Sequence, residues 1–201
     1  MIDNIIVFVH KNKVINVCKI LKKIHGKSPE ELLKKYDTYE TLPIDLERLA
    51  INIGISVIPF DFSEMEQKIG KKGILGLILT AGDNAAIFYR KSDSLNRVRF
   101  TIAHEIAHCC ALDPTTKEPH IEWRMDDSEK NDFEKEMDIF AGRLLIPLEK
   151  LKQVYLSLEK PASAVLSQKF GVSVSVMEAR LNYLKISHYN SKDEPVIYGN
   201  E

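Results

Sequence analysis

The spacing of apolar residues changes along the chain, and each spacing predicts a different element. Residues 14–36 form a lysine-rich stretch with apolar positions at helical spacing. This spacing predicts one helix that ends at Gly26 and a shorter helix from Pro29. Residues 43–54 carry proline near the start and glycine just past the end. We therefore expect a further helix there, with proline in its first turn.

Three short apolar runs predict strands. Residues 55–60 alternate in the manner of a strand, and two more runs follow at residues 74–80 and 85–89. The last two runs flank the tetrad Ala-Gly-Asp-Asn at residues 81–84, which is rich in turn-forming residues. This arrangement predicts a β-hairpin, and hence a small sheet built from three strands.

The second half of the chain is predicted to be mainly helical. Residues 100–112 are apolar apart from three residues, so we expect a buried helix there, followed by a polar loop over residues 113–127. A second helix should begin after Ser128, which can act as its N-cap, and end near Leu145. A third helical stretch is expected from residue 147, and a short strand near residues 196–198.

Residues 161–184 have the layout of a helix-turn-helix. Gly171 permits the tight turn, and Ser173 can cap the second helix. Two hypotheses follow from this layout: the helix pair binds DNA, or it serves packing and substrate docking. The second helix offers only Arg180 and Lys185 as cations, a poor set for phosphates or base edges, which favours packing or docking.

The composition fits one folded domain or two small ones, since 44% of the 201 residues are hydrophobic and 28% are charged. Lys and Arg total 28 and Asp and Glu total 29, giving a formal net charge of -1. The chain therefore has no overall attraction to nucleic acid or anionic lipid. Its apolar runs are far shorter than the roughly 20 residues that span a bilayer. We expect a soluble protein with no membrane partner.

The cysteines and the N-terminus favour a cytoplasmic location. The 3 cysteines are Cys18, Cys109 and Cys110, an odd number with two adjacent members. Free thiols in a reducing compartment are therefore expected. Residues 1–10 place an acid ahead of a short apolar run, with no small-residue cleavage site behind it. This is not the pattern of a secretory signal.

The polar residues of the predicted buried helix form the motif H-E-x-x-H. His108 lies about 40° round the helix from His104, so both imidazoles leave one face and can bind a single ion. Glu105 lies on the same side, where it can act as a general base without binding the ion. Alternatively, the histidines bond backbone carbonyls in a core helix. Burying these groups unpaired would cost about 1 to 3 kcal/mol each, and a metal ion removes that cost.

The next predicted helix offers a third ligand. Glu134, Asp138, Ala141 and Leu145 fall on one stripe, with the polar members at one end. Glu134 would bind the ion, and Asp138 could accept a hydrogen bond from the other ring nitrogen of a ligand histidine. Glu136 points away from this stripe and is a weaker candidate. The alternative is that these acids form a solvated charged face.

Two motifs in order resemble the ImmA/IrrE family of zinc metallopeptidases. The first is residues 97–108, which end in H-E-x-x-H, and the second is residues 134–147, with Glu-x-x-x-Asp and Phe-Ala-x-x-Leu-Leu-x-Pro. The helix at residues 43–54 and the hairpin at residues 74–89 are similar to the upstream part of that family. The resemblance covers roughly residues 43–184.

This resemblance implies a thermolysin-like Zn²⁺ site. Its ligands would be His104, His108 and Glu134, with Glu105 as the base. Proteins of this family resemble regulatory proteases that cut a helix-turn-helix transcriptional repressor and so release phage, mobile-element or stress-response genes. The family usually has glycine where Ala107 stands, and this change touches no ligand.

The sequence as a whole predicts an α+β fold in which a small sheet packs on zincin-type site helices, followed by a helical, helix-turn-helix-like C-terminal part. We expect an N-terminal helical segment (residues 1–42), a metallopeptidase domain (43–147) and a C-terminal region with a tail (148–201). The expected function is a zinc-dependent endopeptidase that cleaves a helix-turn-helix repressor or an antitoxin. The alternative is a noncatalytic regulator that binds its partner and uses zinc structurally. Direct DNA binding is not expected.

Overall fold

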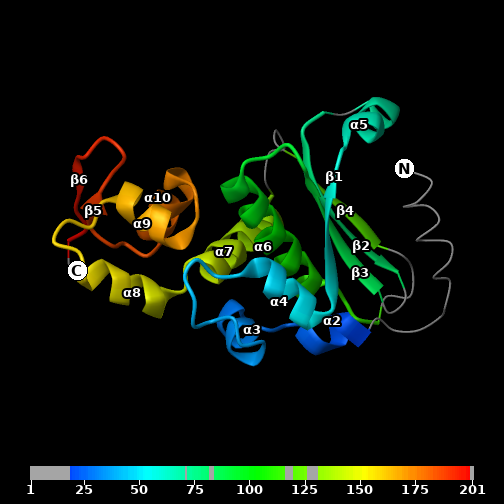
Figure 1. Cartoon of the computed structure of the whole chain (residues 1–201), viewed down its shortest axis with the longest axis horizontal. Coiled ribbons are helices and arrows are strands. Elements are labelled where there is room, and N and C mark those ends of the chain that lie inside the picture. Colours follow the sequence, from blue (N-terminus) through cyan, green and yellow to red (C-terminus); the bar gives the residue numbers. More distant parts are fainter. Residues whose placement is uncertain (1–18, 71, 82–83, 116–119, 126–130, 200–201) are drawn as a thin grey trace.

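The computed structural model describes residues 19–70, 72–81, 84–115, 120–125 and 131–199 (Figure 1). The strands are β1 (Ile55–Phe60), β2 (Ile74–Ala81), β3 (Asn84–Arg90), β4 (His120–Met125), β5 (His188–Tyr189) and β6 (Pro195–Val196). The helices are α2 (Lys19–Ile24), α3 (Pro29–Lys35), α4 (Leu46–Ile53), α5 (Ser63–Ile69), α6 (Leu95–Ala111), α7 (Asp132–Leu145), α8 (Leu148–Leu156), α9 (Ser163–Phe170) and α10 (Val174–Tyr183). The predicted α+β class is confirmed.

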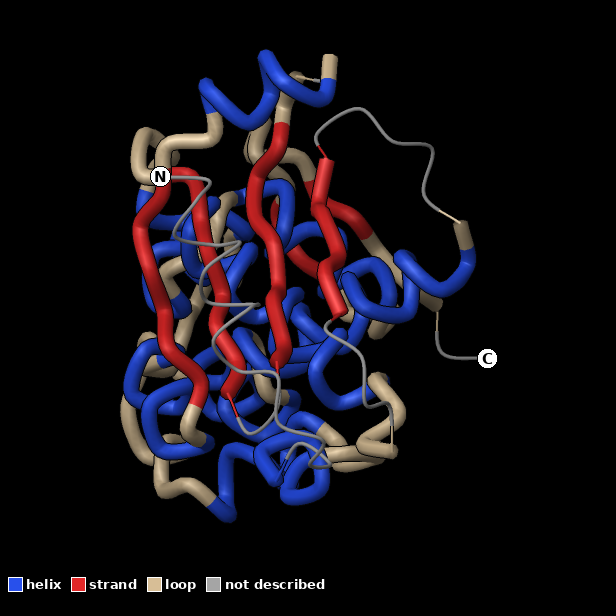
Figure 2. The backbone as a smooth tube through the Cα atoms, turned by 90° about the vertical axis from the view of Figure 1, so that its right-hand side faces the viewer, coloured by secondary structure: helices blue, strands red, loops and turns tan. Residues whose placement is uncertain are grey.

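The main sheet has four strands in the order β1-β3-β2-β4. β2 and β3 form the predicted antiparallel hairpin, with Thr80 opposite Ala85, and β1 pairs with β3 in parallel. Figure 2 shows the strands side by side, with helices behind them. The prediction of three strands was wrong by one, because β4 lies where a polar loop was expected. Its sequence, His-Ile-Glu-Trp-Arg-Met, alternates polar and apolar residues, which is the pattern of a strand at the edge of a sheet.

Both faces of the central strands are buried, which explains their continuous apolar runs. Side chains alternate between the two faces, so Ile78 and Ile87 belong to the core formed with the helices. Leu77 and Phe88 belong to a second cluster on the other face, which includes Met65 of α5. α5 itself was not predicted, because it is short and Met65 is its only buried residue.

The helix predicted at residues 43–54 begins later than expected. α4 starts at Leu46, and its N-cap is Asp45, whose Oδ1 accepts a hydrogen bond of 2.9 Å from the backbone of Arg48. Pro43 therefore precedes the helix, and its placement in the first turn was wrong. Gly54 ends the helix with a φ of 104°, a conformation that favours glycine, as predicted.

The two site helices also begin at positions that differ from the prediction. α6 starts at Leu95, earlier than the predicted residue 100. The prediction missed the first turn, because this turn is exposed and does not show the apolar pattern of the later turns. α7 starts at Asp132, and Asn131 is its N-cap, with Oδ1 accepting a hydrogen bond of 2.8 Å from the Glu134 backbone. Ser128, the predicted cap, lies outside the described residues. The predicted end of α7 at Leu145 is confirmed.

The C-terminal part contains the predicted helix pair, α9 and α10. Gly171 turns the chain between them with a φ of 60°, and the Ser173 side chain caps α10. Arg99 of α6 ties this pair to the site helix, because Nε donates to the Gly171 carbonyl at 2.8 Å and Nη2 to the Phe170 carbonyl at 3.3 Å. The short strand expected near residues 196–198 is found at Pro195–Val196, paired with β5.

One core of buried residues runs through all three predicted segments. It includes Ile24 of α2, Ile102 of α6 and Leu181 of α10. α6 packs on β2 and β3 on one side and on α7 on another. In the described part of the chain, no helix combines the length and apolar character needed to cross a membrane.

The Arg99 contacts predict a measurable share of stability. Arg99→Met keeps the apolar stem and removes both donors, so it should lower the free energy of unfolding by about 1 to 2 kcal/mol in urea denaturation. Arg48→Met, at an exposed position of α4, is the control and should stay within about 0.5 kcal/mol of the unchanged protein. Equal losses in the two variants would show that Arg99 does not hold the helix pair in place.

Candidate metal centre

The candidate centre lies where α6 and α7 pack side by side (Figure 1). α6 contributes His104, Glu105 and His108, which are 0%, 1% and 2% exposed. α7 contributes Glu134 and Asp138, whose side chains are 24% and 23% exposed. The centre is thus buried on the α6 side and reached by solvent on the α7 side.

Three side chains converge on one point. The Nε2 atoms of His104 and His108 lie 3.0 Å apart. Glu134 approaches both of them, with Oε2 3.2 Å from His104 Nε2 and Oε1 3.5 Å from His108 Nε2. Within the described part of the chain, these three residues form a group that could hold one metal ion.

The spacing of the three groups fits a tetrahedral metal ion. Bonds of about 2.0 to 2.1 Å in a tetrahedron place neighbouring ligand atoms about 3.3 Å apart. The contacts between the three side chains, 3.0, 3.2 and 3.5 Å, bracket that value, with the two Glu134 contacts made by its two different carboxylate oxygens. Two nitrogens and one carboxylate oxygen also leave a fourth position for a water molecule or a substrate.

The hydrogen bonding of His104 supports the same conclusion. His104 Nδ1 donates to Asp138 Oδ1 at 2.9 Å, since a carboxylate can only accept. In the neutral ring, Nε2 then presents its lone pair toward the Glu134 carboxylate. Two electron-rich groups facing each other at 3.2 Å repel, and a cation between them removes the repulsion.

The ionisation of His104 is suited to metal binding. Burial lowers its pKa, the hydrogen bond to Asp138 opposes this effect, and the nearby charges of Arg124 and His108 lower the pKa further. The ring is therefore held in the neutral form that binds a metal. Cys110 offers no competing ligand, because burial raises the pKa of its thiol to about 12.

Glu105 is positioned by a close approach between α6 and β2. A Cβ atom at Gly76 would lie 2.4 Å from Thr101 Cγ2 and 3.4 Å from Glu105 Oε1. A side chain at Gly76 would force Thr101 to shift, and its absence lets the Glu105 carboxylate lie against the strand. Gly76 is paired with Arg124 of β4, and the missing side chain leaves space on the face where Arg124 points.

Arg124 is the residue of the site that the sequence did not reveal. Its Nη1 donates to Thr101 Oγ1 at 2.9 Å, and its guanidinium lies 4.8 Å from the centre of the Phe100 ring. Burial lowers the pKa of Arg124, while the carboxylates of Asp138, Glu105 and Glu134 favour its charged form. The polar and apolar alternation of β4 was the one signal that could have placed it.

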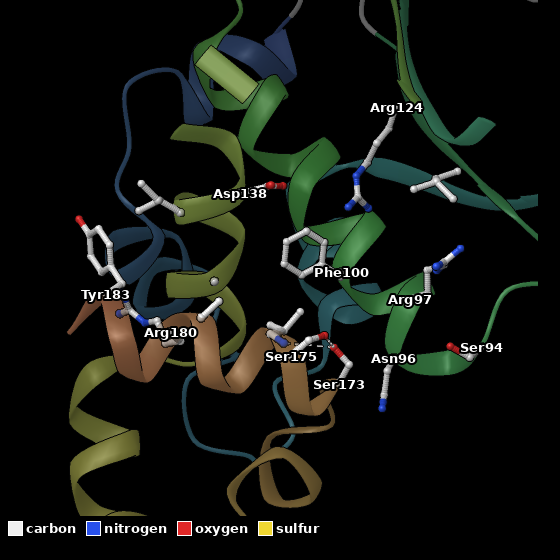
Figure 3. Close-up of a pocket in the computed structure, with 15 residues that line it drawn as sticks. Ser94, Asn96, Arg97, Phe100, Arg124, Asp138, Ser173, Ser175, Arg180 and Tyr183 are labelled. Atoms are coloured by element: carbon white, nitrogen blue, oxygen red, sulfur yellow. Dashed lines mark hydrogen bonds between the residues drawn. The ribbon is translucent and has the colours of Figure 1, made fainter. Parts of the chain in front are cut away.

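A groove of about 640 Å³ adjoins the centre at Asp138. We call it the α6–α10 groove, because α6, α7 and α10 form its walls, with Arg124 entering from β4 (Figure 3). Phe100 and Arg97 of α6 line it, and so do Val176 and Tyr183 of α10. The groove thus links the candidate centre to the C-terminal helix pair.

An α+β fold with H-E-x-x-H on one helix and a carboxylate on the next is the arrangement of a metallopeptidase-type protein. The family model for peptidase M78, described as the IrrE N-terminal-like domain, matches residues 52–182, so the chain belongs to the ImmA/IrrE family. No curated protein matches the chain closely enough to count as a relative. The family indicates a peptidase, and hence a protein substrate.

The structure brings together the five residues that the sequence assigned to the site. His104, His108 and Glu134 share one point, Asp138 contacts His104, and Glu105 lies beside them on α6. Glu136, the weaker candidate, is exposed on α7. Their roles as ligands, orienting group and base remain predictions, which substitutions can test.

The hydrogen bond between Asp138 and His104 predicts a graded loss of metal affinity. Asp138→Ala leaves the ring of His104 without its acceptor and should weaken Zn²⁺ binding about 10- to 100-fold. Asp138→Asn keeps an acceptor oxygen and should cost less. Competition with a coloured chelator measures both affinities, and Glu136→Ala, an exposed change on the same helix, should leave binding unaltered. Equal affinity in the Asp138→Ala and Glu136→Ala proteins would refute the orienting role.

The close approach at Gly76 predicts a specific pattern of stability. Gly76→Ala should lower the free energy of unfolding by about 1 to 3 kcal/mol, because the new Cβ would overlap the Thr101 methyl group. Adding Thr101→Ser removes that methyl, keeps the hydroxyl that accepts from Arg124, and should restore most of the loss.

A second glycine provides the matched control. A Cβ at Gly142 of α7 would meet only Arg180 Cδ, at 3.9 Å. Gly142→Ala should therefore stabilise the protein by about 0.5 to 1 kcal/mol through helix propensity. If Gly76→Ala proves as harmless as Gly142→Ala in urea denaturation, α6 does not depend on this contact for its position.

Proposed function

We propose that this protein is a cytoplasmic, zinc-dependent endopeptidase that cleaves one specific protein partner. The observation that carries the proposal is the convergence of His104, His108 and Glu134 at 3.0 to 3.5 Å, with a buried carboxylate, Glu105, beside them on the same helix. An ion site made only to join two helices would not require that extra buried acid.

Each residue of the centre has a distinct role in this proposal. His104, His108 and Glu134 would hold the zinc ion, and Asp138 would fix the ring of His104 through its Nδ1. When bound, zinc supplies Lewis acidity, which lowers the pKa of water and polarises a carbonyl oxygen.

Glu105 would move the proton in the reaction. Its carboxylate would accept a proton from the attacking water molecule and then donate that proton to the nitrogen of the departing amine. The new bond joins the water oxygen to the peptide carbon, and the carbon–nitrogen bond breaks. Burial at 1% exposure favours transfer, because competing solvent is excluded.

We infer that the partner is a helix-turn-helix repressor or an antitoxin of a phage, a mobile element or a stress response. This inference rests on the family resemblance, which implies regulatory cleavage of such proteins. The groove beside the centre supports a protein partner, because its walls combine apolar and charged side chains over about 640 Å³.

Direct DNA binding has less support from the C-terminal helices. Arg180, the cation of α10, is 6% exposed and donates Nε to the Ile146 carbonyl at 3.3 Å. Its guanidinium therefore belongs to the packing of α10 on the rest of the protein. Lys185, the other predicted cation, lies beyond the end of α10, which leaves this helix with too little charge for phosphate contacts.

The alternative function is a noncatalytic regulator. In that case the ion would only join α6 to α7, and binding of the partner would produce the regulatory effect. The two functions differ in what they require of Glu105, which is not among the three converging ligands.

Glu105→Gln separates the two functions. The variant should still bind Zn²⁺, while cleavage of a helix-turn-helix repressor that the unchanged protein cuts should fall about 10²- to 10⁴-fold, because the amide cannot accept the proton. Mass spectrometry of the products and metal analysis of the protein give the two readouts. Glu136→Gln, an exposed change on α7, is the control. A regulatory response that persists unchanged with Glu105→Gln would support the noncatalytic alternative.

A further inference from the structure

The α6–α10 groove has two chemically different parts. In Figure 3 the side chains of Arg97 and Arg124 lie on one side, Tyr183 lies on the other, and Phe100 lies between them. Phe100 is half-buried, and Tyr183 is 60% exposed. A bound segment would therefore meet two arginines at one end of the groove. At the other end it would meet mainly apolar surface, beside the largely buried Arg180, whose guanidinium lies 5.9 Å from the centre of the Tyr183 ring.

Among the described residues, the lining of the groove holds three arginines, Arg97, Arg124 and Arg180, and one carboxylate, Asp138. The Glu105 and Glu134 carboxylates also act on Arg124, but they belong to the candidate centre, where the proposed ion would offset their charge. Arg97 and Arg124 are close enough that the charge of Arg97 lowers the pKa of Arg124. Asp138 accepts a hydrogen bond from His104 at 2.9 Å. Two neighbouring guanidinium groups that face a groove favour an anionic group between them.

The apolar part is open because its floor is made of small residues. Gly142 of α7 and Ala179 of α10 lie there, and a Cβ added at Gly142 would meet one atom, Arg180 Cδ, at 3.9 Å. Ile139, which is 36% exposed, and Val176 flank this floor. A large apolar side chain would fill the space and cover surface that is otherwise exposed to water.

We propose that this groove binds a segment of the protein substrate in which an acidic side chain lies next to a large apolar one. Arg97 and Arg124 bind the carboxylate, and Phe100, Val176 and Tyr183 contact the apolar side chain. The inference rests on the proposed function. Because the groove begins at Asp138, beside the candidate centre, the acidic residue lies within a few positions of the bond that is cut.

A protein segment suits the groove better than a nucleic acid does. The few arginines of the lining, of which Arg180 is only 6% exposed, provide few phosphate contacts, and the wall formed by Ile139 and Val176 is aliphatic. An acidic peptide needs only one carboxylate at the arginines. Phe100, Val176 and Tyr183 then contact the apolar residue that lies next to the acidic one in the peptide.

Binding of small probes tests the groove independently of catalysis. Two capped dipeptides, N-acetyl-Glu-Leu-amide and N-acetyl-Gln-Leu-amide, are titrated into the full zinc-loaded chain and followed by amide chemical shifts. The Glu probe should bind about fivefold more tightly than the Gln probe, because only it pairs with the arginines. The shifts should be largest at Val176 and Ala179.

Substitutions then assign the difference to the arginines. Arg97→Gln and Arg124→Gln should each reduce the preference for the Glu probe, and Arg48→Gln, an exposed arginine of α4, should leave it at about fivefold. Equal binding of the two probes, or shifts outside the groove, would overturn the proposal. So would inorganic phosphate or a short DNA duplex that binds as tightly as the Glu probe, which would make the groove a general anion site.

Cleavage of a peptide library by the full chain separates this proposal from the proposed function. The products should be enriched in Asp or Glu near the cut, and Arg97→Gln should raise KM for those substrates with little change in kcat. Cleavage without that enrichment would overturn the groove proposal and leave the peptidase intact. If the library is not cut and the Glu probe still binds preferentially, the peptidase function fails and the groove remains supported.

Discussion

The structure depends on one electrostatic constraint, which is the meeting of two imidazole nitrogens and a carboxylate between α6 and α7. Water does not reach the buried side of this cluster, because His104 and His108 are at most 2% exposed. Asp138 accepts a hydrogen bond from Nδ1 of His104, so in the neutral ring the lone pair of Nε2 faces Glu134. A cation at this point would satisfy all of these groups at once, because both imidazole lone pairs and the carboxylate could bind it.

The remainder of the fold brings α6 close to the sheet and α7 close to α6. β2 is buried on both faces, and α6 approaches it closely at a glycine, Gly76. The absence of a side chain at Gly76 leaves space for two neighbouring side chains. Glu105 lies against this glycine, and Arg124 is its pairing partner on β4. The carboxylate proposed as the base is therefore placed by the sheet as well as by its own helix. Its surroundings hold three carboxylates near one guanidinium, a balance that a bound divalent ion would shift toward positive charge.

Sequence could place the residues that share a helix, because the helical period fixes which of them share a face. His104, Glu105 and His108 follow from their spacing alone, and the spacing of Glu134 and Asp138 puts them on one stripe of α7. Arg124 could not be found in this way. Its position depends on the register between β4 and β2, which is a tertiary property, and β4 lies in a stretch of mixed polarity. The start of α6 was missed for a related reason, since its first turn is exposed and shows no apolar period.

The C-terminal helix pair shows how one local layout can serve two different purposes. Its turn and cap are those of a helix-turn-helix, yet the second helix forms a wall of the groove, and Arg180 is used for packing against the Ile146 carbonyl. Arg99, on the helix that carries the histidines, holds the turn of the pair through two backbone carbonyls. The pair is thus fixed to the candidate centre rather than free to turn toward a duplex. A segment bound along α10 would reach the centre at Asp138. The groove that recognises a partner and the centre that cleaves it would then form one continuous surface.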